Sequence, residues 1–273
     1  MNKVLKLPLS LSPLLEEKLV KLGFEKLENP NVVFAYKGNN LTVVFYPTGT
    51  LLIQGKGDAE NLVENLISEL NLESNYIGTD EAGKGDLFGP LVVCGFAVDN
   101  TTTAEKILKL GVQDSKKLSE KAIGEIAREL IKLERHKCLK INPETYNRLY
   151  RKFQNLNKLL SFAHACVIDA LYIETAIEKA ITDKFMKGSY IDCYLKAGVE
   201  LLEEVGAERY PGVAAASVIA RYIYLEELKK LSKLAGVELK SGSGEDAKRI
   251  FKELRTKFDR ELLSKLAKLH FKI

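Results

Sequence analysis

One short stretch of the chain places acidic residues and glycines at a spacing that suits metal and phosphate chemistry. Residues 76–90 read YIGTDEAGKGDLFGP, in which Asp80 and Glu81 follow a short apolar segment and a Gly-Lys-Gly run occupies 83–85. Carboxylate oxygens are hard ligands for a divalent cation, and glycine lets the backbone approach a ligand closely. The stretch predicts a metal ion beside a phosphate. The alternative is a solvated turn, in which Gly and Asp are ordinary residues.

The same stretch also has nearly the spacing of a nucleotide-binding P-loop. Gly85, however, stands where that motif requires a Ser or Thr as a magnesium ligand. The charges of Asp80 and Glu81 would also repel the phosphates that such a loop holds. We therefore exclude a P-loop nucleotidase.

A further acid lies inside an apolar segment. Residues 190–194 read YIDCY, a pattern that predicts a short buried strand carrying Asp192. A buried, ionised carboxylate is costly without a partner. Asp192 therefore needs either a cation shared with Asp80 and Glu81 or a salt bridge to a basic side chain. Asp114 and Glu208 are other acids near the ends of apolar elements.

The composition is that of a soluble chain of one large domain, or of a small and a larger one. It has 273 residues, is 46% hydrophobic and carries a net charge of +4, which permits nucleic-acid binding without requiring it. The four cysteines lack CxxC spacing, so we expect buried thiols in a reducing compartment, neither zinc ligands nor disulfides. The N-terminus lacks the apolar core of a signal peptide, and no apolar run reaches about 18 residues. These features predict a cytoplasmic protein without membrane association.

Residues 1–70 are predicted to form a small α+β module with an antiparallel sheet. A helix begins at Ser12 and ends at Gly23, three strands follow at 31–36, 41–46 and 50–54, and a second helix covers 59–70. The module contains no catalytic constellation, so we expect it to dock substrate. Residues 71–75 are polar and are predicted to be a linker.

Residues 76–273 are predicted to form an α/β domain, a mixed sheet flanked by helices. Strands are expected at 76–80, 91–98, 135–141 and 190–194. Helices are expected at 119–133, 144–153, 156–180, 196–205 and 213–234, followed by a Lys-rich helix after 242–244.

Several motifs in this second part resemble, in order, the signature of type 2 ribonucleases H. They are TDEAGKGD at 79–86, FGPLVV at 88–93, DSK at 114–116, ID at 191–192 and AAASVIAR at 214–221. Within that class the chain is more similar to ribonuclease HIII than to ribonuclease HII, which typically has Gly-Arg-Gly at 83–85. Residues 155–160, NLNKLL, with His164 after them, also resemble the HIII pattern. The N-terminal part is similar to that family's module of the TATA-binding-protein fold.

The resemblance implies an RNase H-like fold that hydrolyses the RNA strand of RNA/DNA hybrids with Mg²⁺ or Mn²⁺ and produces 5′-phosphomonoesters. Two ions roughly 4 Å apart would activate water and stabilise the leaving oxygen. It implies Asp80, Glu81, Asp192 and Glu208 as catalytic and metal-binding residues. Glu208 is assigned with a one-residue gap, and Glu204 and Glu226 remain substitutes for it.

The resemblance also implies the residues that contact substrate. Gly83 and Gly85 would reach the ribose 2′-hydroxyl, and Lys84 and Lys116 would meet phosphates as point charges. Ser115 would hydrogen-bond there or cap the next helix. We expect a monomer. The alternative functions are incision at single ribonucleotides embedded in DNA, as in ribonuclease HII, and hybrid binding without catalysis.

Overall fold

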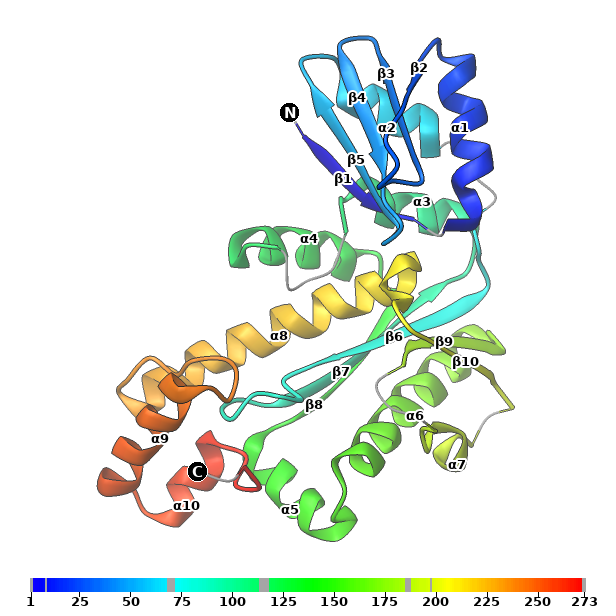
Figure 1. The fold of residues 1–273 in the computed structure, drawn as a ribbon. Coiled ribbons are helices and arrows are strands. Elements are labelled where there is room, and N and C mark those ends of the chain that lie inside the picture. The colour runs from blue at the N-terminus through cyan, green and yellow to red at the C-terminus, as the bar shows by residue number, and fades with distance from the viewer. Residues whose placement is uncertain are drawn as a thin grey trace.

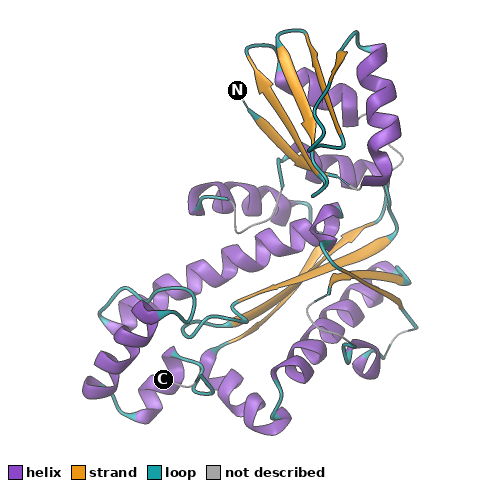
Figure 2. Cartoon of the chain, in the orientation of Figure 1, coloured by secondary structure: helices purple, strands orange, loops and turns teal. Residues whose placement is uncertain are grey.

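The structure is a computed structural model with two β-sheets, each covered by helices (Figures 1 and 2). It describes residues 2–7, 9–67, 72–112, 118–184, 188–196 and 198–271. Asp114, Ser115 and Lys116, which the motif comparison singled out, lie outside the described residues.

The N-terminal sheet is antiparallel and has the strand order β1-β5-β4-β3-β2. Its strands are β1 (Lys3–Lys6), β2 (Glu25–Leu27), β3 (Phe34–Gly38), β4 (Leu41–Phe45) and β5 (Thr50–Gly55). The short η1 (Leu9–Leu11) leads into α1 (Ser12–Lys21), and α2 (Ala59–Ile67) follows β5. The predicted three-strand meander is confirmed as β3–β5. The prediction lacked β1 and β2, and the three residues of β2 are all exposed, so they show no alternation.

The second sheet has the order β10-β9-β6-β7-β8 and is mixed. Its strands are β6 (Tyr76–Ala82), β7 (Leu91–Val98), β8 (His136–Ile141), β9 (Lys179–Asp183) and β10 (Glu200–Glu204). β6 runs antiparallel to β7 and parallel to β9, and β9 runs parallel to β10. The predicted fold class, a mixed sheet flanked by helices, is confirmed.

Two long helices cover opposite faces of this sheet, α8 (Pro211–Ala235) on one and α6 (Leu156–Thr175) on the other (Figure 1). Gly78 permits the close approach of α8, since a β-carbon there would lie 2.3 Å from the carbonyl carbon of Gly212. α6 is the one described helix long and apolar enough to span a bilayer. Its buried residues lie in the apolar core against β6 and β7, so it is a core helix.

The remaining helices extend these layers. They are α3 (Thr101–Lys109), α4 (Glu120–Lys132), α5 (Pro143–Phe153), α7 (Ile191–Tyr194), η3 (Ala207–Arg209), α9 (Glu245–Lys257) and α10 (Arg260–Leu266). α4 lies beside α8, and α10 lies beside α5. The N-terminal part contacts the rest of the chain where α2 meets α3, and one apolar core continues across that contact.

Two predicted elements are wrong and a third is too long, and all three errors fall between 176 and 205. The predicted helix 156–180 ends at Thr175, because Ala176 adopts a left-handed conformation with φ 56°, and β9 begins shortly after. The predicted strand 190–194 is the short helix α7, in which Ile191 is buried and Asp192 is exposed. Residues 196–205, which were predicted to form a helix, include the strand β10 instead.

The expectation that no cysteine forms a disulfide is also wrong. Cys94 and Cys138 are direct partners in the register of β7 and β8, with Cα atoms 4.1 Å apart, and they form a disulfide. Their separation of 44 residues gives no local signal, and only the strand register brings them together. Cys166 and Cys193 are free thiols.

Candidate active site

The site begins where the pairing between two neighbouring parallel strands ends. In the register of β6 and β9 the last paired residues are Thr79 and Thr182. Asp80 follows the first of these and Asp183 follows the second, so the two carboxylates leave the sheet at the same edge. Glu81 comes next on β6 and has its side chain on the opposite face from that of Asp80. The topology thus brings three acids to one edge.

A fourth acid reaches the same place through η3. Asp183 Oδ1 accepts a hydrogen bond of 3.0 Å from the backbone N–H of Ala207, which fixes η3 against the end of β9. Glu208 is the next residue. Asp80, Glu81, Asp183 and Glu208 all line one pocket of about 670 Å³, together with Lys84, Ser217 and Arg221.

Burial and the repulsion between neighbouring carboxylates dominate the electrostatics of Asp80 in this pocket. Burial raises the pKa of Asp80 to about 8, and the neighbouring charges of Glu81 and Asp183 add to the rise. Hydrogen bonds from the Ser217 side chain and from the Glu81 backbone N–H act in the opposite direction. A divalent cation would remove the repulsion and favour the ionised form of Asp80.

Glu81 is held on both carboxylate oxygens. Its Oε2 lies 3.3 Å from Nε2 of His164, and its Oε1 lies 3.7 Å from Nζ of Lys84. His164 is fully buried. Lys84 thus lies beside the acids, where its charge would also attract a phosphate.

The donor set of this pocket suits Mg²⁺ or Mn²⁺, since carboxylate oxygens are the ligands that these ions prefer. In the part of the chain that the structure describes, no three acidic, histidine or cysteine side chains are already drawn together as a closed metal cluster. The fit therefore rests on the chemistry of the four carboxylates and on the raised pKa of Asp80.

The structure does not bring Asp192 to this pocket. It is exposed on α7, which lies against α6, so the burial that made it a metal-ligand candidate is absent. Asp183, which the sequence analysis missed, lines the pocket instead. Its signal was the pair of β-branched residues immediately before it, Ile181 and Thr182, which favour a strand.

The two substitutes for Glu208 lie outside this pocket. Glu204 forms an ion pair with Arg209 and accepts a hydrogen bond from the Tyr210 hydroxyl. Glu226 is on α8 and forms an ion pair with Lys229. Glu208 is thus the one of the three acids that lines the pocket with Asp80.

The two glycines of the 83–85 run differ in their surroundings. Gly83 is buried with φ +87°, and a β-carbon there would lie 2.1 Å from the Pro90 carbonyl oxygen, so the turn itself requires glycine. Gly85 is exposed, with no atom within 4 Å of its would-be β-carbon. Only Gly85 has open space for a ligand beside its backbone.

The C-terminal segment braces the loop between β6 and β7. The buried Nζ of Lys268 donates hydrogen bonds to the carbonyl oxygens of Asp86 and Gly89, at 2.9 and 2.7 Å. The backbone N–H of Gly89 also donates to the carbonyl of Leu266, at 3.2 Å. The loop that carries Lys84 and Gly85 is therefore fixed from behind by the residues after α10.

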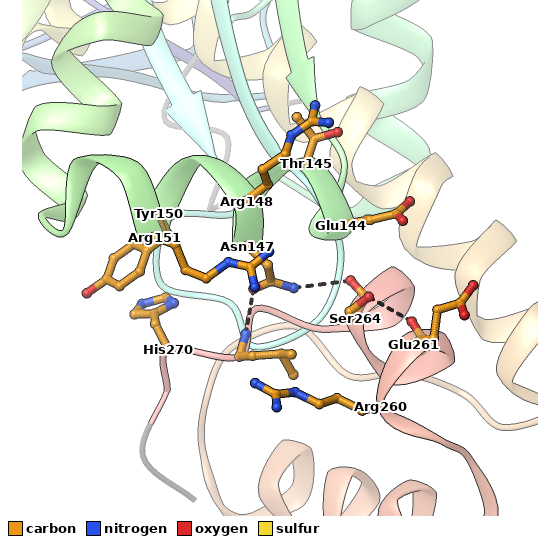
Figure 3. A pocket seen from close by; sticks show the side chains of 11 residues that line it. Glu144, Thr145, Asn147, Arg148, Tyr150, Arg151, Arg260, Glu261, Ser264 and His270 are labelled. Atoms are coloured by element: carbon orange, nitrogen blue, oxygen red, sulfur yellow. Dashed lines mark hydrogen bonds between the residues drawn. The ribbon is translucent and has the colours of Figure 1, made fainter.

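Another cavity, of about 710 Å³, lies between α5 and the C-terminal segment, away from these carboxylates (Figure 3). Asn147 joins its two walls through hydrogen bonds to the carbonyl of Ser264 and the backbone N–H of Leu269. Its acids are Glu144 and Glu261, and it is also lined by three arginines, Arg148, Arg151 and Arg260. It therefore lacks the cluster of four carboxylates that suits a divalent metal ion in the other pocket.

A mixed sheet that brings acids together where β6 and β9 stop pairing is the arrangement expected of an RNase H-like nuclease. The comparisons with known proteins agree with this class. The ribonuclease HII family model matches residues 77–273, which include the whole second sheet and all four pocket acids.

Relatives that span nearly the whole chain are more specific. Ribonuclease HIII of Aquifex aeolicus is 35% identical over 253 residues, covering 90% of this chain and 94% of the relative. Ribonuclease HIII of Chlamydia pneumoniae is 35% identical over 275 residues, covering 94% and 92%. The crystal structure of Bst-RNase HIII in complex with Mn²⁺ matches with a TM-score of 0.67 and 30% identity, covering 99% of this chain and 96% of that one. The chain belongs to the ribonuclease HIII family.

Proposed function

We propose that this protein is a metal-dependent endoribonuclease that hydrolyses the RNA strand of RNA/DNA hybrids and leaves 5′-phosphomonoesters. The observation that carries the proposal is the convergence of Asp80, Glu81, Asp183 and Glu208 on one pocket. Family membership and the Mn²⁺ complex of Bst-RNase HIII support it.

In this proposal the four carboxylates hold Mg²⁺ or Mn²⁺. When bound, the metal supplies Lewis-acid activation of water and neutralises the charge on the phosphate and the leaving oxygen. Asp80 and Asp183 present their carboxylates from neighbouring strand ends, and Ser217 holds Asp80 by a hydrogen bond. Asp183 replaces Asp192 in the proposed set.

The basic and glycine residues of the pocket are proposed to hold the substrate. Lys84 and Arg221 line it and would contact phosphate oxygens. The open space beside Gly85 supports a backbone contact to the ribose, where the 2′-hydroxyl distinguishes RNA from DNA. The buried position of Gly83 does not support such a contact for that residue.

We propose that the N-terminal part docks the substrate. A second groove, of about 670 Å³, is lined on one side by Lys6, Thr48 and Gly49 of the N-terminal part. On the other side it shares Val205, Gly206 and Glu208 with the carboxylate pocket. A nucleic acid bound over the acids would therefore extend toward the turn between β4 and β5. Within this proposal, residues 1–70 are the docking module, 71–75 the linker and 76–273 the catalytic domain.

We also propose that the protein acts as a monomer in the cytoplasm. All four pocket acids come from one chain, so catalysis needs no second copy.

A direct assay tests the activity. The full chain is incubated with Mg²⁺ or Mn²⁺ and either a uniform RNA/DNA hybrid or a DNA duplex with one embedded ribonucleotide. We expect cleavage of the uniform hybrid, with 5′-phosphate ends. Cleavage of the second substrate alone would instead indicate ribonuclease HII-like incision. Binding of the hybrid without cleavage in either metal would indicate an inactive binder.

A further inference from the structure

We propose that His164 is a positioning residue that orients the carboxylate of Glu81, and that the hydroxyl of Thr79 in turn fixes the orientation of the His164 ring. The inference rests on the proposed function, because it concerns how one of the metal-binding carboxylates is held.

His164 lies between two residues of β6. Its Nδ1 is 2.9 Å from Oγ1 of Thr79, and its Nε2 is 3.3 Å from Oε2 of Glu81. Thr79 and His164 are both completely buried. Thr79 and Glu81 are two residues apart on a strand, so their side chains share the face that α6 covers. The histidine therefore reaches both from the helix above them.

The hydrogen-bonding capacities of the three groups assign the direction of each bond. An ionised carboxylate only accepts hydrogen bonds, so the proton between the ring and Glu81 belongs to Nε2. In the neutral ring, Nδ1 then accepts the hydrogen bond that the Thr79 hydroxyl donates. Thr79 thereby selects the tautomer in which the ring donates to Glu81. This is the arrangement by which residues behind a metal ligand set its direction.

The packing of α6 on the sheet makes this contact possible. Gly95 is the partner of Thr79 on β7. A β-carbon at Gly95 would lie 2.7 Å from side-chain atoms of Val167 and Leu171, one and two turns after His164 on α6. The missing side chain lets the helix approach closely enough for a histidine to reach the strand. The contact of His164 with Glu81 is therefore part of how the fold is packed.

The consequence for the site is that the carboxylate of Glu81 is held in one orientation. His164 holds Oε2 from inside the fold, while Oε1 faces Lys84 at the pocket. Without the histidine, the carboxylate would keep its contact with Lys84 but lose the one that holds Oε2, and binding a metal ion would cost more because the ion would first have to fix the direction of that oxygen.

Mn²⁺ binding, measured by electron paramagnetic resonance on the full-length protein, tests the proposal without relying on turnover. We expect His164→Leu to weaken Mn²⁺ binding by roughly 10- to 100-fold, the range typical of residues behind a metal ligand. His164→Gln places an amide N–H near the position of Nε2, and it should recover most of the affinity. Thr79→Val keeps the shape of the side chain but removes its hydroxyl, and it should weaken binding roughly 2- to 10-fold, as expected for one hydrogen bond.

A double variant separates positioning from simple packing. If Thr79 acts through His164, Thr79→Val should have no further effect on Mn²⁺ binding in the His164→Leu background. Val167→Ala, one turn along the buried face of α6, is the matched control. It should lower the melting temperature and leave Mn²⁺ affinity unchanged.

Three results would overturn the inference. They are wild-type Mn²⁺ affinity in folded His164→Leu, full additivity of the two substitutions, and an equal loss of affinity in Val167→Ala. If His164→Leu does not fold, Thr79→Val decides, and wild-type affinity in that variant would overturn the inference. Failure of the wild type to cleave hybrids would instead refute the proposed function, and the Mn²⁺ measurements would still be interpretable.

Discussion

Asp80 and Asp183 occupy equivalent positions on neighbouring parallel strands, each directly after a threonine that belongs to the last residue pair of β6 and β9. The sheet therefore sets the spacing of their backbone positions, because adjacent strands lie about 4.8 Å apart. Two carboxylates at that spacing repel each other in a partly buried pocket, so the strand pairing is favourable only where a cation or a proton compensates.

Asp183 and Asp192 form a matched pair for mutagenesis. Asp183→Asn should reduce hybrid cleavage at least about 100-fold, more than the loss of a residue behind a metal ligand usually costs. Asp192→Asn removes the same charge from an exposed position on α7 and should leave the rate within a factor of about two, as exposed substitutions usually do. Single-turnover cleavage of a uniform hybrid measures both. Loss of activity in Asp192→Asn alone would show that the third acid has been misassigned.

The raised pKa of Asp80 predicts how the metal-free protein responds to pH. The carboxyl group has a pKa of about 8 in the fold and an ordinary value of 3.8 when exposed. Between these values the folded state binds more protons than the unfolded state, so stability should fall as pH rises from about 4 to about 8. One proton contributes at most about 1.4 kcal/mol per pH unit. Urea unfolding in EDTA measures the slope.

Asp80→Asn is the control for this pH dependence, because it removes the titrating group while keeping its size. The slope between pH 4 and 8 should become shallower in this variant. Added Mn²⁺ should stabilise the wild type more strongly toward pH 8, since metal binding requires the ionised carboxylate. A wild-type slope that persists unchanged in Asp80→Asn would assign the titration to another group.

Lys268 should stabilise the loop between β6 and β7. Lys268→Met keeps the length of the side chain but leaves the carbonyl oxygens of Asp86 and Gly89 without their buried donor. An unsatisfied buried group costs about 1–3 kcal/mol, so the free energy of unfolding should fall by about that amount. Hydrogen exchange at residues 84–89 should also become faster. Lys265→Met is the control, because it removes an ion pair with Glu261 within α10 and does not touch the loop. It should leave hydrogen exchange at residues 84–89 unaltered.

The proposed docking role of the N-terminal part can be tested with one added charge. Thr48 is exposed in the groove that leads from Glu208 to the N-terminal sheet. Thr48→Glu should raise KM for the hybrid and leave kcat unchanged, because its charge repels phosphates without touching the carboxylates. The effect should shrink at high ionic strength. Lys21→Glu on α1 changes the net charge by more but lies outside the groove, and an equal rise in KM there would indicate a nonspecific charge effect.

The elements near residues 76–98 and 211–235 were predictable because their local patterns are strong. The apolar strand β7, bounded by Pro90 and Asn100, and the helix opened by Pro211 with small residues after it both match their expected ranges closely. Asp80, Glu81 and Glu208, three of the four acids named from the motifs, line one pocket.

The region around β9 could not be resolved from local pattern alone. α6 ends at Thr175, and the left-handed residue after it is Ala176 in place of the usual glycine or asparagine, so the sequence contains no stop signal there. The apolar residues after it continue a helical pattern, which hid Asp183. The segment 190–194 has strand-like alternation, but only Ile191 is buried when it forms α7. Pairing of β9 with β6 decides the first case, and the packing of α7 on α6 decides the second.

The pairing of β6 with β9 links positions 103 residues apart, as the contact between Thr79 and Thr182 shows. A nascent chain that is not yet synthesised as far as β9 therefore has Asp80 and Glu81 but lacks Asp183 and Glu208. Closing so long a segment is slow compared with forming a helix or a hairpin. Nuclease activity should therefore appear late in folding, after β9 has paired with β6. An incompletely synthesised chain should not cut nucleic acid.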